Sequence, residues 1–104
     1  MTRGTDAETV IERALIRHAA DAGVALEISA ARSRPWASVT FSGARHMLAV
    51  SAATGGSAEQ WLSALADAEL SVAGHLVADA VVGDRREVDG RIEAAIELLS
   101  VEDR

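Results

Sequence analysis

The chain has 104 residues, of which 49% are hydrophobic and 25% are charged, and its net charge is −6 at pH 7. This length and balance predict a single folded domain over residues 1–104 and exclude a disordered chain. The acidic charge argues against a nucleic-acid partner, because phosphate contacts need a positively charged surface.

Four amino acids are missing altogether: cysteine, lysine, asparagine and tyrosine. The absence of cysteine excludes disulfides and thiolate chemistry. The remaining bias toward alanine and arginine points to a bacterium with a GC-rich genome. We find no signal-peptide pattern and no apolar stretch of membrane-spanning length, so a cytoplasmic protein without a membrane partner is expected.

The first predicted helix covers residues 5–22. Thr5 and Glu8 fit a capping box at its start, and Gly23 fits the left-handed residue that ends many helices. His18 lies on the apolar stripe of this helix, so we expect it at the edge of the core rather than in a reactive site.

A period of two follows Gly23 and predicts strands. Residues 24–31 alternate as a half-buried strand, and the segment RSRP at 32–35 is expected to break it. Two further strands are predicted at 36–42 and 46–52, joined by a turn at Gly43.

The second half begins with another capping box, formed by Ser57 and Gln60. It predicts a short helix that ends at residue 65 or 66. Two more strands are expected at 69–73 and 75–84, on either side of a glycine.

Residues 91–102 fit two different structures. Their apolar positions match a helical stripe, but Asp89-Gly90 is a strong signal for a two-residue hairpin turn. We favour the strand, because folding back at this turn pairs Arg86 with Glu93. If the segment were helical, the order of elements would resemble that of bacterial type III secretion chaperones, which are also small and acidic.

The predicted fold is therefore α+β with two layers. Two helices pack on one face of a mostly antiparallel sheet of five to six strands. Because each half would read helix, strand, strand, strand, the order also suggests a duplicated αβββ unit.

His46 and His75 each follow a glycine and precede an apolar strand. They could lie together at one end of the sheet, or they could simply flank turns at its rim. Asp79 stands four residues after His75, about 13 Å along a strand, which is too far for direct contact. No catalytic residues, metal ligands or cofactor are predicted from these groups.

Asp79 itself lies within the apolar run LVADAVV and has two possible environments. It either faces solvent or is a buried carboxylate that needs a partner. The hairpin register, with Val81 opposite Leu98, favours the buried alternative, although a slip of one residue reverses the assignment.

Arginines gather at two predicted loops, and the segment RSRPW combines guanidinium groups with an indole face. Such a group could hold a carboxylate or phosphate, or it could be solvated charge that protects a sheet edge. The candidate ligand-binding residues are Arg32, Arg34, Trp36, Arg45, His46, His75 and Asp79.

The face of the sheet away from the helices is predicted to be flat, small and mildly apolar. Such a surface is typical of a protein contact, and a second copy of the chain is the simplest partner. We therefore expect a non-catalytic homodimeric assembly, adaptor or chaperone-like module that could also bind another protein. The alternative is a binder of an anionic small molecule, or a simple enzyme, in which His46 or His75 acts with nearby arginines in a pocket between Trp36 and Trp61. The residues expected on the face of the sheet away from the helices are Ala25, Ala31, Ala37, Met47, Ala49 and Ala73, with Trp36 and Leu99 nearby.

Overall fold

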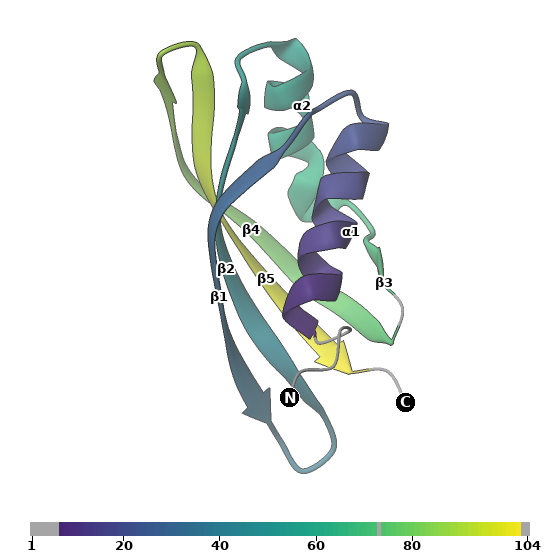
Figure 1. The fold of residues 1–104 in the computed structure, drawn as a ribbon. Helices are drawn as coiled ribbons and strands as arrows, with labels where there is room; N and C mark the ends of the chain where they lie inside the picture. Colours follow the sequence, from purple (N-terminus) through teal and green to yellow (C-terminus); the bar gives the residue numbers. More distant parts are fainter. Residues whose placement is uncertain (1–6, 73, 103–104) are drawn as a thin grey trace.

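A computed structural model describes residues 7–72 and 74–102 and has an α+β fold (Figure 1). Four long antiparallel strands form the sheet in the order β1-β2-β5-β4, and the two-residue strand β3 is added beside β4. The elements are α1 (Ala7–Asp21), β1 (Glu27–Ala37), β2 (Ser42–Ala53), α2 (Gly56–Ala64), the 3₁₀ turn η1 (Leu65–Asp67), β3 (Ser71–Val72), β4 (His75–Val88) and β5 (Arg91–Glu102).

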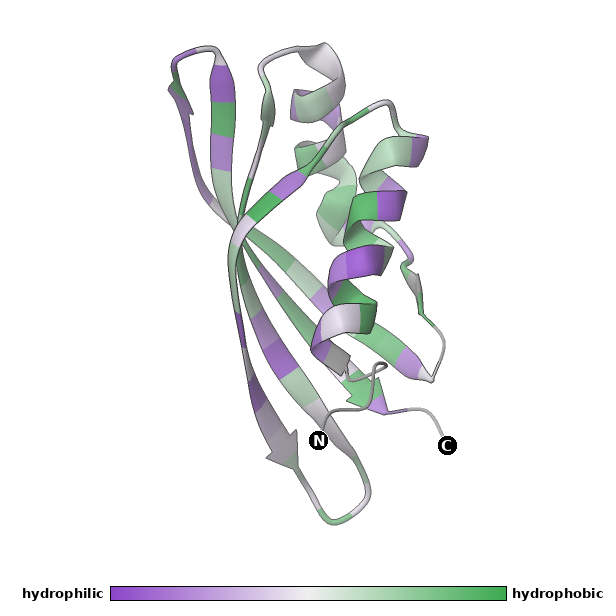
Figure 2. Cartoon of the chain, in the orientation of Figure 1, coloured by the Kyte–Doolittle hydropathy of each residue, from purple (hydrophilic) through white to green (hydrophobic). Residues whose placement is uncertain are grey.

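Both helices lie on the same side of the sheet, and the core fills the space between them and the strands (Figure 1). Hydrophobic and hydrophilic positions alternate along the strands in Figure 2, as expected for a sheet with one covered face. We call the covered side the inner face and the other side the outer face. The largest fully buried apolar side chains of the core are Ile11, Leu15, Leu65, Ile96 and Leu98.

The end of α1 agrees with the sequence analysis. Gly23 has a φ of 83°, and the N–H of Val24 donates to the carbonyl of Ala19 at 2.9 Å. His18 is partly buried at the core edge, where its Nδ1 accepts a hydrogen bond from the indole N–H of Trp61 at 2.9 Å. Thr5, the other half of the predicted capping box, lies outside the described residues.

The first hairpin differs from the prediction in the position of its turn. β1 runs without interruption through 32–35, because it is an edge strand and an edge tolerates the missing N–H of Pro35. The turn falls at 38–41, where the N–H of Ser38 donates to the carbonyl of Phe41 at 2.7 Å. Gly43 therefore lies inside β2 and not in a turn.

The start of α2 also differs. Gly55 occupies the N-cap position, and its carbonyl accepts the N–H of Glu59 at 3.1 Å. Ser57 lies inside the first turn of the helix, so the predicted capping box of Ser57 and Gln60 does not form its N-terminus.

Residues 91–102 form a strand, as favoured, and the hairpin turn lies at Asp89-Gly90. Both turn residues have positive φ, 53° and 78°, which is the requirement of a two-residue type I′ turn. Arg86 Nε lies 3.3 Å from Glu93 Oε1, which confirms the predicted cross-strand pair. The order of elements therefore does not resemble that of type III secretion chaperones, which would require a helix at residues 91–102.

A bulge interrupts the pairing of β4 with β5 between Val82 and Arg85. Beyond it Leu98 pairs with Ala80, not with Val81 as predicted. The extra residue turns the strand over, so Ala80 is buried and Val81 is 49% exposed.

The duplicated αβββ unit and the predicted strand number are not confirmed. β1 covers most of the strand predicted at 24–31 and only the first two residues of the strand predicted at 36–42. Two strands therefore follow the first helix, whereas three follow the second. Among residues 7–72 and 74–102, no helix is long and apolar enough to cross a membrane.

Candidate functional site

The sheet separates the candidate residues into two groups on opposite faces. His46 and His75 belong to the inner group, which lies at the end of the core near Glu8 at the start of α1. The outer group comprises Arg32, Arg34, Trp36, Arg45 and Asp79.

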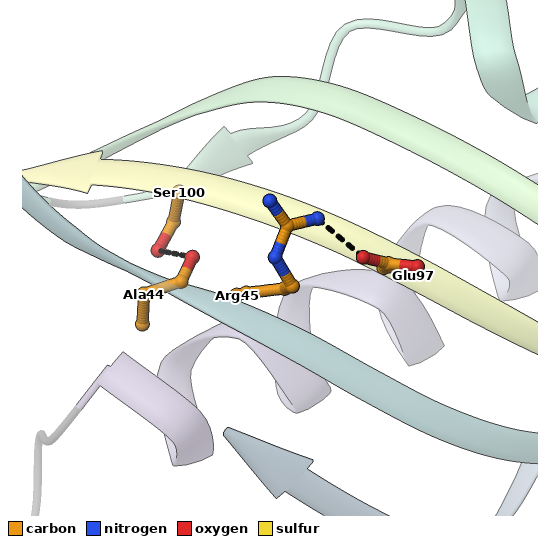
Figure 3. Close-up of polar contacts among 4 residues, drawn as sticks. All are labelled: Ala44, Arg45, Glu97 and Ser100. Carbon is orange, nitrogen blue, oxygen red and sulfur yellow. Dashed lines mark hydrogen bonds and ion pairs between the residues drawn. The ribbon is translucent and has the colours of Figure 1, made fainter. Parts of the chain in front are cut away.

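His46 is almost fully buried at 2% exposure, and its Nε2 lies 2.9 Å from the hydroxyl oxygen of Ser100. Ser100 is completely buried and donates to the carbonyl of Ala44 at 3.3 Å (Figure 3). With the hydroxyl proton directed to that carbonyl, the serine oxygen accepts the Nε2–H of His46. The network links β2 to β5 at the end of the core.

Burial lowers the pKa of His46 below its usual value of 6.5. The carboxylate of Glu8 on α1 acts in the opposite direction, and the imidazole of His75 on β4 adds to the lowering. The two histidines are therefore electrostatic neighbours. His46 and Ser100 form a structural link rather than a nucleophile with its base, because the serine hydroxyl is committed to a backbone carbonyl.

His75 lines a cleft of about 280 Å³ that opens beside the His46–Ser100 link. Glu8 and Glu102 also line this cleft, so its charged groups are acidic. The Nδ1 atom of His75 is buried and has no hydrogen-bond partner among residues 7–72 and 74–102. In the described part of the chain, no three His, Asp or Glu side chains gather in a way that could hold a metal ion.

The register places the outer group in rows across the sheet. Arg34 on β1 pairs with Arg45 on β2, Arg45 pairs with Leu99 on β5, and Leu99 pairs with Asp79 on β4. Arg45 forms an ion pair with Glu97 on the neighbouring strand β5 (Figure 3). Because the bulge of β4 pairs Asp79 with Leu99, this carboxylate is exposed to solvent and not buried as the hairpin register predicts.

The middle of the outer face is a shallow hollow of about 470 Å³. Small residues from four strands form its floor, and no helix of the described chain covers it (Figure 1). Met47 and Ala49 lie there as predicted, whereas Ala31 packs toward the core and Ala73 lies outside the described residues. The small side chains are those of Ala30, Ala49, Gly83 and Ala95.

The structure does not form a pocket between the two tryptophans. Trp61 is buried in the core on the helix side, and Trp36 lies on the outer face, where it lines a pocket together with Arg34 and Arg45. The arginines and histidines are likewise on opposite faces, so they cannot act together on one ligand.

Sequence reasoning did not identify Ser100, Glu8 and Glu102 as neighbours of the histidines. Ser100 had a detectable signal, since it continues the alternating inward positions of β5 that include Ile96 and Leu98. Glu8 and Glu102 reach the cleft through the packing of α1 and the register of β5, which the sequence alone did not provide.

No family model, curated protein or solved structure matches this chain.

Proposed function

We propose that the protein is a non-catalytic assembly or adaptor module of the cytoplasm that binds a protein surface, in the first place a second copy of itself, through the outer face of its sheet. The observation that carries this proposal is the uncovered hollow of Ala30, Ala49, Gly83 and Ala95. Small side chains let another backbone approach closely, and apolar surface gains free energy when it leaves water.

The face is a better contact surface than either edge of the sheet. Pro35, Arg32 and Arg34 lie on the edge strand β1, and proline and charge both disfavour pairing with another strand. At the other edge, β3 pairs only with His75 and Leu76, and the rest of β4 carries two bulges and charged residues such as Asp79, which disfavour pairing with another strand. The outer face, in contrast, presents the exposed apolar side chains of Leu76 and Val81.

A glutamate in the hollow tests this proposal. In Ala49→Glu, the buried contact would have to accept an unpaired carboxylate, so the complex should weaken by at least about 100-fold. Light scattering during gel filtration should give a mass above the 10.9 kDa of one chain for the wild type and the single-chain mass for the variant. The matched control is Ala20→Glu on the exposed side of α1, which should keep the larger mass. A wild type that stays at the single-chain mass at high concentration would contradict self-binding.

A second candidate is the binding of a small ligand in the cleft beside His75. It differs from the anionic ligand expected from the sequence, because Glu8 and Glu102 favour a positively charged group such as a primary amine. Small primary amines should raise the thermal unfolding midpoint of the wild type, and the rise should disappear in Glu8→Gln. An equal rise in both proteins would show that the amines act elsewhere.

A further inference from the structure

The outer face carries opposite charges at its two sides. Arg32 and Arg34 lie on β1, and Asp79 lies on β4, three strands away. At the usual strand spacing this separation is about 14 Å, so Arg34 and Asp79 of one chain cannot pair with each other. Among the described residues, neither has an ion pair within the chain.

We infer that two copies of the chain pack outer face to outer face about a two-fold axis that runs along the strands, between β2 and β5. This inference rests on the proposed function and specifies its geometry. Such an axis reverses the strand order of the facing sheet, so β1 lies over β4 of the second copy and β2 lies over β5. Strand directions remain nearly aligned, as in common sheet packings.

The arrangement joins Arg34 with Asp79 because it preserves position along the strands, whereas Arg32 lies over Val81 of the other copy. Arg34 and Asp79 occupy the same row of the sheet, through Arg45 and Leu99. Arg34 of each copy therefore faces Asp79 of the other, and the symmetry forms this contact twice. The other two-fold axis for facing sheets, perpendicular to the strands, would place β1 over β1 and β4 over β4, so Arg34 of one copy would not face Asp79 of the other.

The neighbouring row supports the same axis with apolar groups. Trp36 pairs with Gly43, Gly43 pairs with Val101, and Val101 pairs with Leu76. The half-buried indole of Trp36 thus faces Leu76 of the second copy, a leucine that is 61% exposed in the single chain. A contact with an aromatic ring would remove this leucine from water.

The centre of the interface consists of the small residues of the hollow. Ala49 pairs with Ala95 across β2 and β5, so the axis places Ala49 of one copy over Ala95 of the other. Methyl groups allow the sheets to approach to about 10 Å, the usual distance between packed sheets. Four strands about ten residues long present a face on the order of 600 Å² per chain, close to the roughly 800 Å² per partner of a standard interface.

Two charge-reversed variants test this geometry when they are measured separately and as a mixture. Arg34→Glu places two acidic groups in each contact, and Asp79→Arg places two basic groups there. Sedimentation equilibrium should show that each variant alone dimerises at least about tenfold more weakly than the wild type. The equimolar mixture should recover to within about threefold, because each contact of the mixed dimer again holds one acid and one base.

Recovery on mixing requires contacts between chains, since neither variant alone holds a compensating charge. The control pair is Arg17→Glu and Asp21→Arg, two exposed sites of α1, which should dimerise like the wild type alone and together. A monomeric wild type would overturn this inference together with the proposed self-binding. A dimer that Ala49→Glu dissociates, but that the mixture does not restore, would overturn the two-fold geometry and leave the proposed function standing.

Discussion

Gly43→Ala is expected to lower the free energy of unfolding by at least about 3 kcal/mol. A Cβ atom at this position would lie 1.8 Å from the carbonyl oxygen of Ser100 and 2.9 Å from the Cα of Val101. These neighbours are backbone atoms of β5, so no side-chain rotation relieves the overlap, and β2 and β5 must separate. Urea unfolding followed by tryptophan fluorescence measures the loss, and Trp36, which pairs with Gly43, reports on the same end of the sheet.

Gly56→Ala provides the matched control for this substitution. A Cβ atom at Gly56, the first residue of α2, would have no atom within 4 Å. Because alanine favours helix more than glycine does, this variant should be as stable as the wild type or more stable by up to about 1 kcal/mol. A similar loss of stability in both variants would show that the close approach of β5 is not the cause of the Gly43→Ala effect.

The C-terminal hairpin shows how much of this sheet can be predicted from sequence. The turn at Asp89-Gly90 and the pair of Arg86 with Glu93 follow from local residue preferences. The bulge near Gly83 does not, because an extra residue in one strand leaves the alternating pattern on either side intact. That single extra residue decides whether Asp79 is buried or exposed. The turn and its flanking pair are therefore predictable from the sequence, whereas the environment of Asp79 depends on a bulge that the alternating pattern does not reveal.

The first hairpin illustrates a different limit. Pro35 predicts a break if the strand is central, but β1 is an edge strand, where proline is tolerated. Whether a strand lies at an edge is a property of the whole sheet. The sequence likewise predicts a turn at Gly43, whereas the structure places this glycine inside β2, where the absence of a side chain allows the close approach of β5.

For the candidate site, the sequence singled out His46 and His75, and the structure brings them near one end of the sheet. It also separates them from the arginines by the thickness of the sheet. The face that a residue occupies depends on the register of its strand. The register of β1 shifts between Ile28 and Ala30, and periodicity alone does not predict this shift.

The wild type should lose stability as the pH falls below about 6.5, the usual pKa of histidine in an unfolded chain. Burial holds the pKa of His46 in the folded protein below that value. Between the two pKa values the unfolded chain binds a proton that the folded chain does not, so acid favours unfolding in this window. Above it the imidazole is neutral in both states and contributes no pH dependence. Urea unfolding at several pH values measures this slope.

His46→Gln removes the titrating group and should therefore show a smaller decrease in stability over the same pH range. The two neighbours of His46 provide controls of opposite sign. Because Glu8 raises the pKa of His46, Glu8→Gln should lower that pKa further and make the protein more sensitive to acid. Because His75 lowers it, His75→Gln should reduce the contribution of His46 to the slope. Equal slopes in the wild type and His46→Gln would assign the acid sensitivity to other groups, and they would contradict a buried, neutral His46 in the link between β2 and β5.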